Sequence, residues 1–477
     1  MPGRVDDRYL RSSETIANVG AQVRRGERSC VDVVESCLAR IEELEPLVRA
    51  WVIVDRAGAL DQARRLDAEL AAGNWRGPLH GIPIGIKDLV DVAGFVTAAG
   101  SPLLADNVAA RDATLVARLR QAGAVILGKT VTTQFASFDP PATRNPWNFE
   151  RTPGGSSSGS AAAVACGMCL GAIGSQTGGS ITRPASYCGV AGCKPTYGRV
   201  STAGIMPLAP SMDHPGPIGR SVHDLAILLD AIAGPDARDP LCSAQPYARV
   251  AEQCVATRHI ADDAANDAEH RAARERPPRL GVLRGLFWDL AHESARESFM
   301  LAIGKLKSCG ATVSEVALPA SFADVLRSHR VIMSVEAAAE HGPQFRQHPE
   351  EYLPKIRGLV EEGLHAAAPD YVRAKRRQQV LSRDILTCFR GADVLVTPAA
   401  LGPAPDASTT GDPAFNSPWS FTGLPTVSFP LGLADDGLPV GIQLVGRSFG
   451  ELDLMLGALW CQQTLNVGRR KDADAAG

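Results

Sequence analysis

The sequence predicts an α/β fold in which a large sheet carries helices on both faces. Predicted strands, which are short apolar segments, alternate along the chain with predicted amphipathic helices. Capping residues mark the helix ends. The composition agrees, because 45% hydrophobic and 21% charged residues in a chain of 477 are typical of a globular protein with a sizeable core. This length allows about three average domains or one large α/β unit.

The first 75 residues are predicted to form packing helices. Ser29 and Asp32 make a capping box, and apolar residues then repeat at helical spacing until Pro46. A second helical repeat ends at Gly73. This region shows no pattern that is typical of catalysis.

Units of strand and helix are predicted from residue 81 onward. The isoleucines of residues 82–86 alternate on one face of a strand, which directs Lys87 to the opposite face. Asp112 can cap the next helix, and residues 124–127 form a short apolar strand.

The second half of the chain continues this pattern. Ser221 caps a helix that runs to Ala233, and strands are predicted at 279–283, 392–396 and 426–430. The chain therefore divides into N-terminal packing helices (1–75), a catalytic core (76–234), a surface insertion or linker (235–278), a second part of the same α/β domain (279–470) and a tail (471–477).

Charge and cysteine usage exclude several functional classes. Lysine and arginine total 49 against 52 acidic residues, and no long basic run occurs, so neither a nucleic-acid nor a membrane partner is expected. The N-terminus lacks the apolar segment of a signal peptide, and the 11 cysteines are scattered, so we expect a cytoplasmic protein with reduced thiols. The longest uncharged stretch, 152–182, is too rich in glycine and serine to span a membrane.

Residues 152–182 are instead the first place to look for chemistry, because charge is excluded there and glycines allow close backbone packing. A phosphate-binding loop is not supported, since no Gly-Lys-Ser/Thr follows the glycines. Residues 155–159 match G-x-S-x-G, which would make Ser157 the nucleophile of a Ser-His-Asp hydrolase. That motif requires a strand directly before it, and the preceding residues make a poor strand.

Four cysteines in and after this stretch offer a thiol or metal site. Cys166 and Cys169 form a C-x-x-C pair, and Cys188 and Cys193 follow, so together they could hold zinc. The alternative is that these are small buried hydrophobic residues, which is the usual role of a free cysteine.

A serine activated by a lysine is the fourth interpretation. Two glycines precede Ser180, and the backbone N–H groups around them can converge on one point, as an oxyanion hole requires. A serine hydroxyl needs a base, and no histidine lies in the uncharged stretch. Lys87 is the candidate base because burial lowers the pKa of a lysine. Taken alone, Lys87 and Asp88 are more simply a surface salt bridge.

Three motifs in register resemble the amidase signature family. They are Gly81-Ile-Pro-Ile-Gly-Ile-Lys87-Asp88, Pro153-Gly-Gly-Ser156-Ser-Ser-Gly-Ser-Ala161 and Gly174-Ser-Gln-Thr-Gly-Gly-Ser180. The spacing also matches, with Ser180 standing 24 positions after Ser156. The resemblance continues through Asp213, and a second region, 416–451, resembles the C-terminal part of the family.

The resemblance implies a single α/β domain around a mixed, mostly parallel sheet, with no metal or organic cofactor. It implies Ser180 as nucleophile, Ser156 as a bridging residue held by a cis peptide, and Lys87 as base. The implied reaction is hydrolysis of a linear carboxamide through an acyl-enzyme on Ser180, which releases ammonia or an amine and a carboxylic acid. The oxyanion would be held by the backbone N–H groups of Thr177, Gly178, Gly179 and Ser180.

Within this resemblance, two residues favour stand-alone amidases, including malonamidase-type enzymes of small carboxylated amides. Gln176 stands where many members carry Asp, and Arg183 lies three residues after the nucleophile, whereas the A-type chains of amidotransferases usually have Arg two after it. We therefore hypothesise that Arg183 clamps a substrate carboxylate, against the alternative that it braces a carboxylate of the fold. Gln176 and Trp419 are further candidate substrate-binding residues, and Lys129 is expected to be structural.

The expected partner is a small-molecule amide, and a homodimer is left open. The alternative function is the glutamine-amidase A-type subunit of a tRNA-dependent amidotransferase, which would need partner subunits. A metal or redox protein built on Cys166 and Cys169 is the rival from another class.

Overall fold

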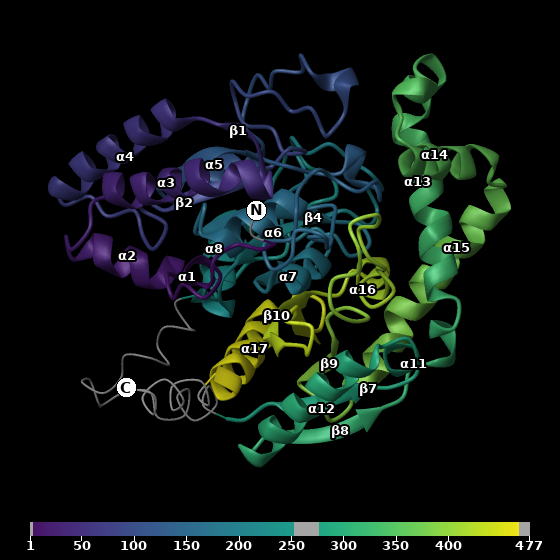
Figure 1. The fold of residues 1–477 in the computed structure, drawn as a ribbon. Coiled ribbons are helices and arrows are strands. Elements are labelled where there is room, and N and C mark those ends of the chain that lie inside the picture. The colour runs from purple at the N-terminus through teal and green to yellow at the C-terminus, as the bar shows by residue number, and fades with distance from the viewer. Residues whose placement is uncertain (1–2, 252–275, 467–477) are drawn as a thin grey trace.

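The computed structural model describes residues 3–251 and 276–466, which form an α/β fold around one 11-stranded sheet (Figure 1). Across the sheet the strands follow the order β1 (Trp51–Val54), β3 (Val125–Thr130), β2 (Pro83–Lys87), β4 (Gly171–Gln176), β6 (His214–Gly219), β5 (Ala191–Lys194), β10 (Thr426–Leu433), β11 (Pro439–Val445), β9 (Val394–Pro398), β7 (Arg279–Leu283) and β8 (Thr312–Val316). Strands from the predicted catalytic core and from the predicted second part thus share one sheet.

The sheet is mixed, as expected, but parallel pairing is confined to two places. β2 runs parallel to β3 and β4, and β7 runs parallel to β8 and β9, whereas the other six neighbouring pairs are antiparallel. The expectation of a mostly parallel sheet is therefore wrong. The reason lies in the connections: helices join β2 to β3, β3 to β4 and β7 to β8, while β10 and β11 form a tight hairpin, which permits only antiparallel pairing.

Helices cover both faces of the sheet. An added Cβ at Gly171 of β4 would meet Leu228 of α8, whereas one at Gly174 would meet Ser157 and Ile181, beside α6 and α7. Because these glycines are three residues apart, they face opposite sides of the strand. The helices packed on the sheet are α6 (Ser158–Cys166) and α7 (Thr182–Cys188) on one face, with α8 (Val222–Ile232), α12 (Glu293–Ser308) and α17 (Glu451–Asn466) on the other.

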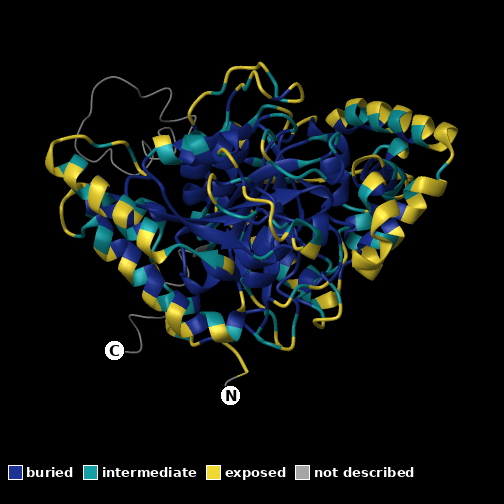
Figure 2. Cartoon of the chain, turned by 90° about the horizontal axis from the view of Figure 1, so that it is seen from above, coloured by how far each residue is buried: buried dark blue, intermediate teal, exposed yellow. Residues whose placement is uncertain are grey.

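Most of the remaining helices lie at the periphery, and their outer faces are exposed while all of the sheet except its edges is buried (Figure 2). α13, α14 and α15 form a lobe at one side of the molecule (Figure 1). These outer helices are α1 (Asp7–Leu10), α2 (Ile16–Arg24), α3 (Cys30–Val48), α4 (Arg56–Ala71), α5 (Thr114–Gln121), α11 (Leu286–Asp289), α13 (Val325–Gln347), α14 (Pro354–His365) and α15 (Ala368–Asp384). The short helix α16 (Ser417–Thr422) is buried along its whole length. Among the described residues, none of the helices has both the length and the apolar character needed to cross a bilayer.

Several helix ends follow the predicted capping, and others do not. The capping boxes at Ser29 and Ser221 are present. α3 continues past Pro46 to Val48, because a proline in the last turn removes only one backbone hydrogen bond. Asp112 does not cap α5; its carboxylate accepts hydrogen bonds from the N–H of Ala93 and from Arg120.

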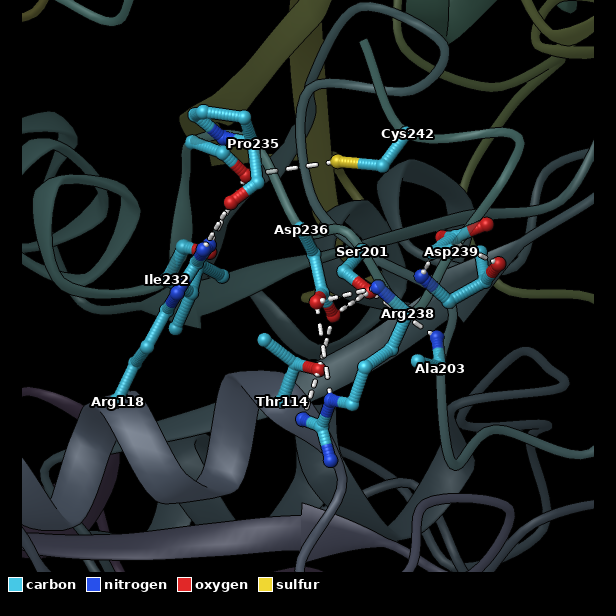
Figure 3. Close-up of polar contacts among 12 residues, drawn as sticks. Thr114, Arg118, Ser201, Ala203, Ile232, Pro235, Asp236, Arg238, Asp239 and Cys242 are labelled. Atoms are coloured by element: carbon cyan, nitrogen blue, oxygen red, sulfur yellow. Dashed lines mark hydrogen bonds and ion pairs between the residues drawn. The ribbon is translucent and has the colours of Figure 1, made fainter. Parts of the chain in front are cut away.

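Two predicted region boundaries also change. The predicted all-helical N-terminal region contains the strand β1. Residues 235–251 of the predicted linker pack onto the domain, because Asp236 accepts hydrogen bonds from the hydroxyls of Thr114 and Ser201 (Figure 3). The rest of the predicted insertion, 252–275, and the predicted tail, 471–477, lie outside the described residues.

Candidate active site

Lys87 lies at the end of β2 and is fully buried. Its Nζ lies 2.7 Å from Oγ of Ser156 and 2.9 Å from Oγ of Ser175. Burial lowers the pKa of Lys87 well below its ordinary value, and the charge of Asp213 opposes this shift only in part. Burial thus favours the neutral form of this amine, which lies next to two hydroxyl groups, as a general base requires.

Asp88 does not pair with Lys87, so the surface salt bridge is excluded. Its carboxylate lies 2.9 Å from Nζ of Lys129, and both side chains are buried. The same Nζ donates to the carbonyl of Val96 and to Thr97. The prediction of a structural Lys129 is thus confirmed.

Ser156 lies between Lys87 and the beginning of α6. The peptide bond between Gly155 and Ser156 is cis, as the resemblance implied. The Ser156 side chain is fully buried, and the Gly155 carbonyl accepts a 2.7 Å hydrogen bond from Arg183. The position of the Ser156 hydroxyl is therefore fixed from both sides.

Ser180 lies in the loop that connects β4 to α7. The backbone carbonyls of Thr177, Gly178 and Gly179 each accept a hydrogen bond, from His329, from the hydroxyl of Ser420 and from the N–H of Arg183 respectively. Within the described chain, no protein group accepts a hydrogen bond from the N–H groups of residues 177–180. The carbonyls of this loop are thus engaged, while its N–H groups are unused donors of the kind that an oxyanion hole requires.

The loop leaves no space for a side chain at Gly179. An added Cβ at Gly179 would lie 2.7 Å from Oδ1 of Asn416. Ser180 is 7% exposed, and in the described structure its hydroxyl makes no hydrogen bond. The Ser180 hydroxyl is therefore free to contact a substrate.

Gln176 supports the loop rather than lining a binding site. Its Oε1 accepts hydrogen bonds from the N–H groups of Ile181 and Thr182 and from the Thr182 hydroxyl, and its Nε2 donates to Ser420. These contacts satisfy N–H groups at the beginning of α7. The expectation that Gln176 contacts substrate is not supported, because its polar atoms are engaged by the protein.

Arg183 and Trp419 are also buried, and the contacts that the structure gives them are with protein groups. Arg183 holds the carbonyl of Gly155 and the hydroxyl of Thr410, and in the described structure it pairs with no carboxylate. Trp419 stacks on Phe287 at a ring distance of 5.6 Å within an apolar cluster. The sequence showed the type of these side chains but not the distant segments that enclose them.

The two other chemical interpretations of the uncharged stretch lose support. Ser157 is fully buried, and its Oγ contacts the backbone of Ser175. Burial raises the pKa of Cys166 to about 12, so this thiol stays protonated, and Cys169 is buried as well. Within the described residues, no group of three or more histidine, cysteine or acidic side chains is placed to hold a metal ion.

Sequence reasoning missed three residues that shape the site. Ser175 contacts Lys87, and His329 reaches the loop from α13, far away in the sequence. Burial lowers the pKa of His329 to about 4, so this imidazole is neutral at physiological pH. Asp213 accepts a hydrogen bond from the Thr177 hydroxyl. Ser175 and Asp213 could have been found, because both lie within the quoted resemblance.

A pocket of about 180 Å³ opens beside Ser175 and Thr177. One wall of the pocket comes from the segment 202–210. Asp239 holds this wall, because its carboxylate accepts hydrogen bonds from both the N–H and the hydroxyl of Thr202, beside the Asp236 contacts drawn in Figure 3. The pocket therefore has one fixed wall and ends next to the candidate catalytic groups.

Comparison with known proteins agrees with this geometry. A family model described as Amidase matches residues 32–455. A Mycobacterium tuberculosis protein named "Putative amidase AmiD" is 37% identical, over 99% of this chain and 98% of that protein. The A-type subunit of the glutamyl-tRNA(Gln) amidotransferase of Roseiflexus castenholzii is 39% identical, over 92% of this chain and 94% of that protein.

The fold comparison leads to the same family. The native peptide amidase of Stenotrophomonas maltophilia is 31% identical and matches with a TM-score of 0.81, over 95% of this chain and 97% of that one. The family model thus covers most of the chain, and the relatives match it over nearly their whole lengths. The chain belongs to the amidase signature family of hydrolases acting on carbon–nitrogen bonds.

Proposed function

We propose that this protein hydrolyses a linear carboxamide through an acyl-enzyme on Ser180, with Ser156 as proton relay and Lys87 as base. The observation that carries the proposal is the 2.7 Å contact between Ser156 and a buried lysine that has no carboxylate partner in the described structure. A serine hydroxyl is a weak nucleophile until a base removes its proton, and a neutral amine supplies that base.

The proposed reaction has two halves. Lys87 takes a proton from Ser156, which takes one from Ser180, and Oγ of Ser180 attacks the amide carbonyl carbon. The N–H groups of residues 177–180 donate to the oxyanion that forms. When the C–N bond breaks, the proton returns through Ser156 to the leaving nitrogen. Water then attacks the ester, loses its proton along the same route, and releases the carboxylic acid and Ser180.

The relay needs one adjustment of the resting site. No hydrogen bond joins the Ser156 and Ser180 hydroxyls in the described structure. Catalytic hydrogen bonds are often long before substrate binds and shorten in the complex. Rotation of the free Ser180 hydroxyl toward Ser156 would close the chain.

A second candidate is the glutamine-amidase subunit of a tRNA-dependent amidotransferase. The 39% identity to the amidotransferase chain of Roseiflexus castenholzii favours it. The two candidates differ in what the isolated chain can do. A stand-alone amidase hydrolyses simple amides by itself, whereas the amidotransferase chain is expected to need its partner chains for full glutaminase activity.

The test is a panel of aliphatic, aryl, carboxylated and glutamine amides, with intact-mass detection of an acyl adduct. We expect an adduct that peptide mapping places on Ser180, and we expect Ser180→Ala to lose it together with turnover. Ser157→Ala is the matched control, because this serine is buried and contacts only backbone; its activity should change by less than about 10-fold. Turnover that survives Ser180→Ala but not Ser157→Ala would refute the assignment.

A further inference from the structure

The pocket beside Ser175 and Thr177 is the candidate site for the acyl group that Ser180 would attack. We propose that it binds a compact, uncharged acyl group of about the size of benzene and rejects acyl groups that carry a carboxylate. This inference rests on the proposed function, since it assigns the substrate class of the same site.

The size of the pocket sets the upper limit. Its volume is about 180 Å³. A cavity of roughly 150 Å³ in another protein interior accommodates benzene, so this pocket has space for about six to eight non-hydrogen atoms. A branched aliphatic or a single-ring acyl group fits within that limit, and a fused two-ring group exceeds it.

The wall of the pocket is apolar and held in place. Ile205, Met206, Leu208 and Pro210 contribute to the lining. The N–H of Met206 donates to the carbonyl of Leu89 over 2.9 Å. Burying an apolar acyl group here stabilises the complex by roughly 25 cal/mol for each Å² removed from water.

The charges around the pocket oppose an anion. Asp213 lies in the lining, and its carboxylate accepts hydrogen bonds from the Thr177 hydroxyl and from the N–H groups of Leu208 and Ala209. Burial raises the pKa of Asp213 to about 6, so at pH 8 this carboxylate is ionised. Glu336 lies close enough to add a second negative charge to the same field.

The described lining of the pocket offers no positive charge opposite these acids. Among the described residues, neither lysine nor arginine lines the pocket. Arg183, the expected carboxylate clamp, is fully buried and holds the Gly155 carbonyl instead. A substrate carboxylate would therefore lose water and face Asp213 without a cationic partner, which is unfavourable.

The first experiment compares two amides of matched shape, isovaleramide and malonamate, in which an isopropyl group replaces a carboxylate. At pH 8 we expect kcat/KM to be at least 100-fold higher for isovaleramide. Along the series acetamide, isovaleramide, benzamide and 2-naphthamide, we expect kcat/KM to rise to benzamide and then fall at least 10-fold. Equal or better hydrolysis of malonamate would overturn the proposal and leave the amidase function intact.

A pair of variants tests the wall directly. Met206→Ala enlarges the pocket, so it should raise kcat/KM for 2-naphthamide relative to benzamide by about 10-fold. The matched control is Met300→Ala, because Met300 is 39% exposed on α12 and should leave this ratio unchanged. An unchanged ratio in Met206→Ala would contradict the assignment of this wall.

A binding measurement separates the two proposals. Ser180→Ala cannot form the adduct, yet its pocket is intact. We expect isovaleramide to raise the Tm of this variant in proportion to its occupancy, and malonamate to raise it less at equal concentration. Preference for isovaleramide in binding without any turnover in the wild-type chain would contradict the proposed function and support the pocket. No preference in binding would contradict the pocket.

Discussion

Two neighbouring strands of the sheet each carry a buried lysine at or directly before the last residue, and the two lysines have different partners. Lys87 on β2 contacts hydroxyl groups, whereas Lys129 on β3 lies 2.9 Å from the carboxylate of Asp88. Burial lowers the pKa of both amines, but Asp88 opposes the shift at Lys129, and the pKa of Lys87 falls further. The comparison teaches that the nearest oxygen determines whether a buried lysine serves as an ion-pair partner or as a base.

The largest effect should come from replacing the amine that contacts hydroxyls. Lys87→Met keeps the length of the side chain and removes the base, so we expect kcat to fall by about 10²–10⁴-fold. The far-ultraviolet circular dichroism should stay unchanged, because no charge partner is left unpaired. A variant that retains more than a tenth of the wild-type kcat would show that Lys87 is not the base.

The matched variant at the other lysine should act on stability. Lys129→Met leaves Asp88 buried and unpaired, so we expect the free energy of unfolding to fall by about 3–5 kcal/mol. Urea denaturation measures this change. If Lys129→Met folds with wild-type stability, the ion-pair interpretation is wrong, and the contrast between the two lysines disappears.

The pH dependence sharpens the same contrast. An amine acts as a base only when it is unprotonated, so activity should be lost as the pH falls through the pKa of Lys87. Because burial holds that pKa well below 10.5, the acidic limb should lie far below the pH at which a free lysine titrates. The measurement is kcat/KM against pH with isovaleramide, and a rate that stays flat down to pH 5 is incompatible with a lysine base.

The smallest effect concerns the arginine that holds the Ser156 peptide. Arg183→Lys should lower kcat by about 10-fold, because it weakens the hydrogen bond to the Gly155 carbonyl and so misplaces Ser156. The loss should be equal for neutral and carboxylated amides. A loss confined to malonamate would restore the carboxylate clamp that the sequence indicated.

The sequence predicted the parts of the site that are carried by local motifs. Lys87 follows from the alternation of its strand, and Ser156 and Ser180 follow from motifs in register. The sequence did not predict which side chains would be enclosed. Gln176 and Trp419 have residue types that suit substrate contact, but N–H groups at the beginning of α7 engage the amide oxygen of Gln176, and Phe287 of α11 covers one face of the Trp419 ring.

The sequence also did not predict which strands are neighbours and whether they pair parallel or antiparallel. Local alternation identifies a strand such as Arg279–Leu283, which the structure reproduces. Its neighbours depend on contacts between segments more than a hundred residues apart, as between β7 and β9. The sequence also did not predict the pocket wall at Met206, for the same reason. This wall is held by contacts of Met206 with Leu89 and of Thr202 with Asp239, and no sequence motif marks those contacts.

The most direct test of this account measures the protonation of the two lysines. Lysine labelled at Cε and Nζ can be followed by nuclear magnetic resonance, with Lys87→Met and Lys129→Met assigning the two signals. We expect Lys87 to be a neutral amine at the pH of maximal activity and to gain its proton at a lower pH than Lys129. A charged Lys87 in the fully active enzyme would contradict the account.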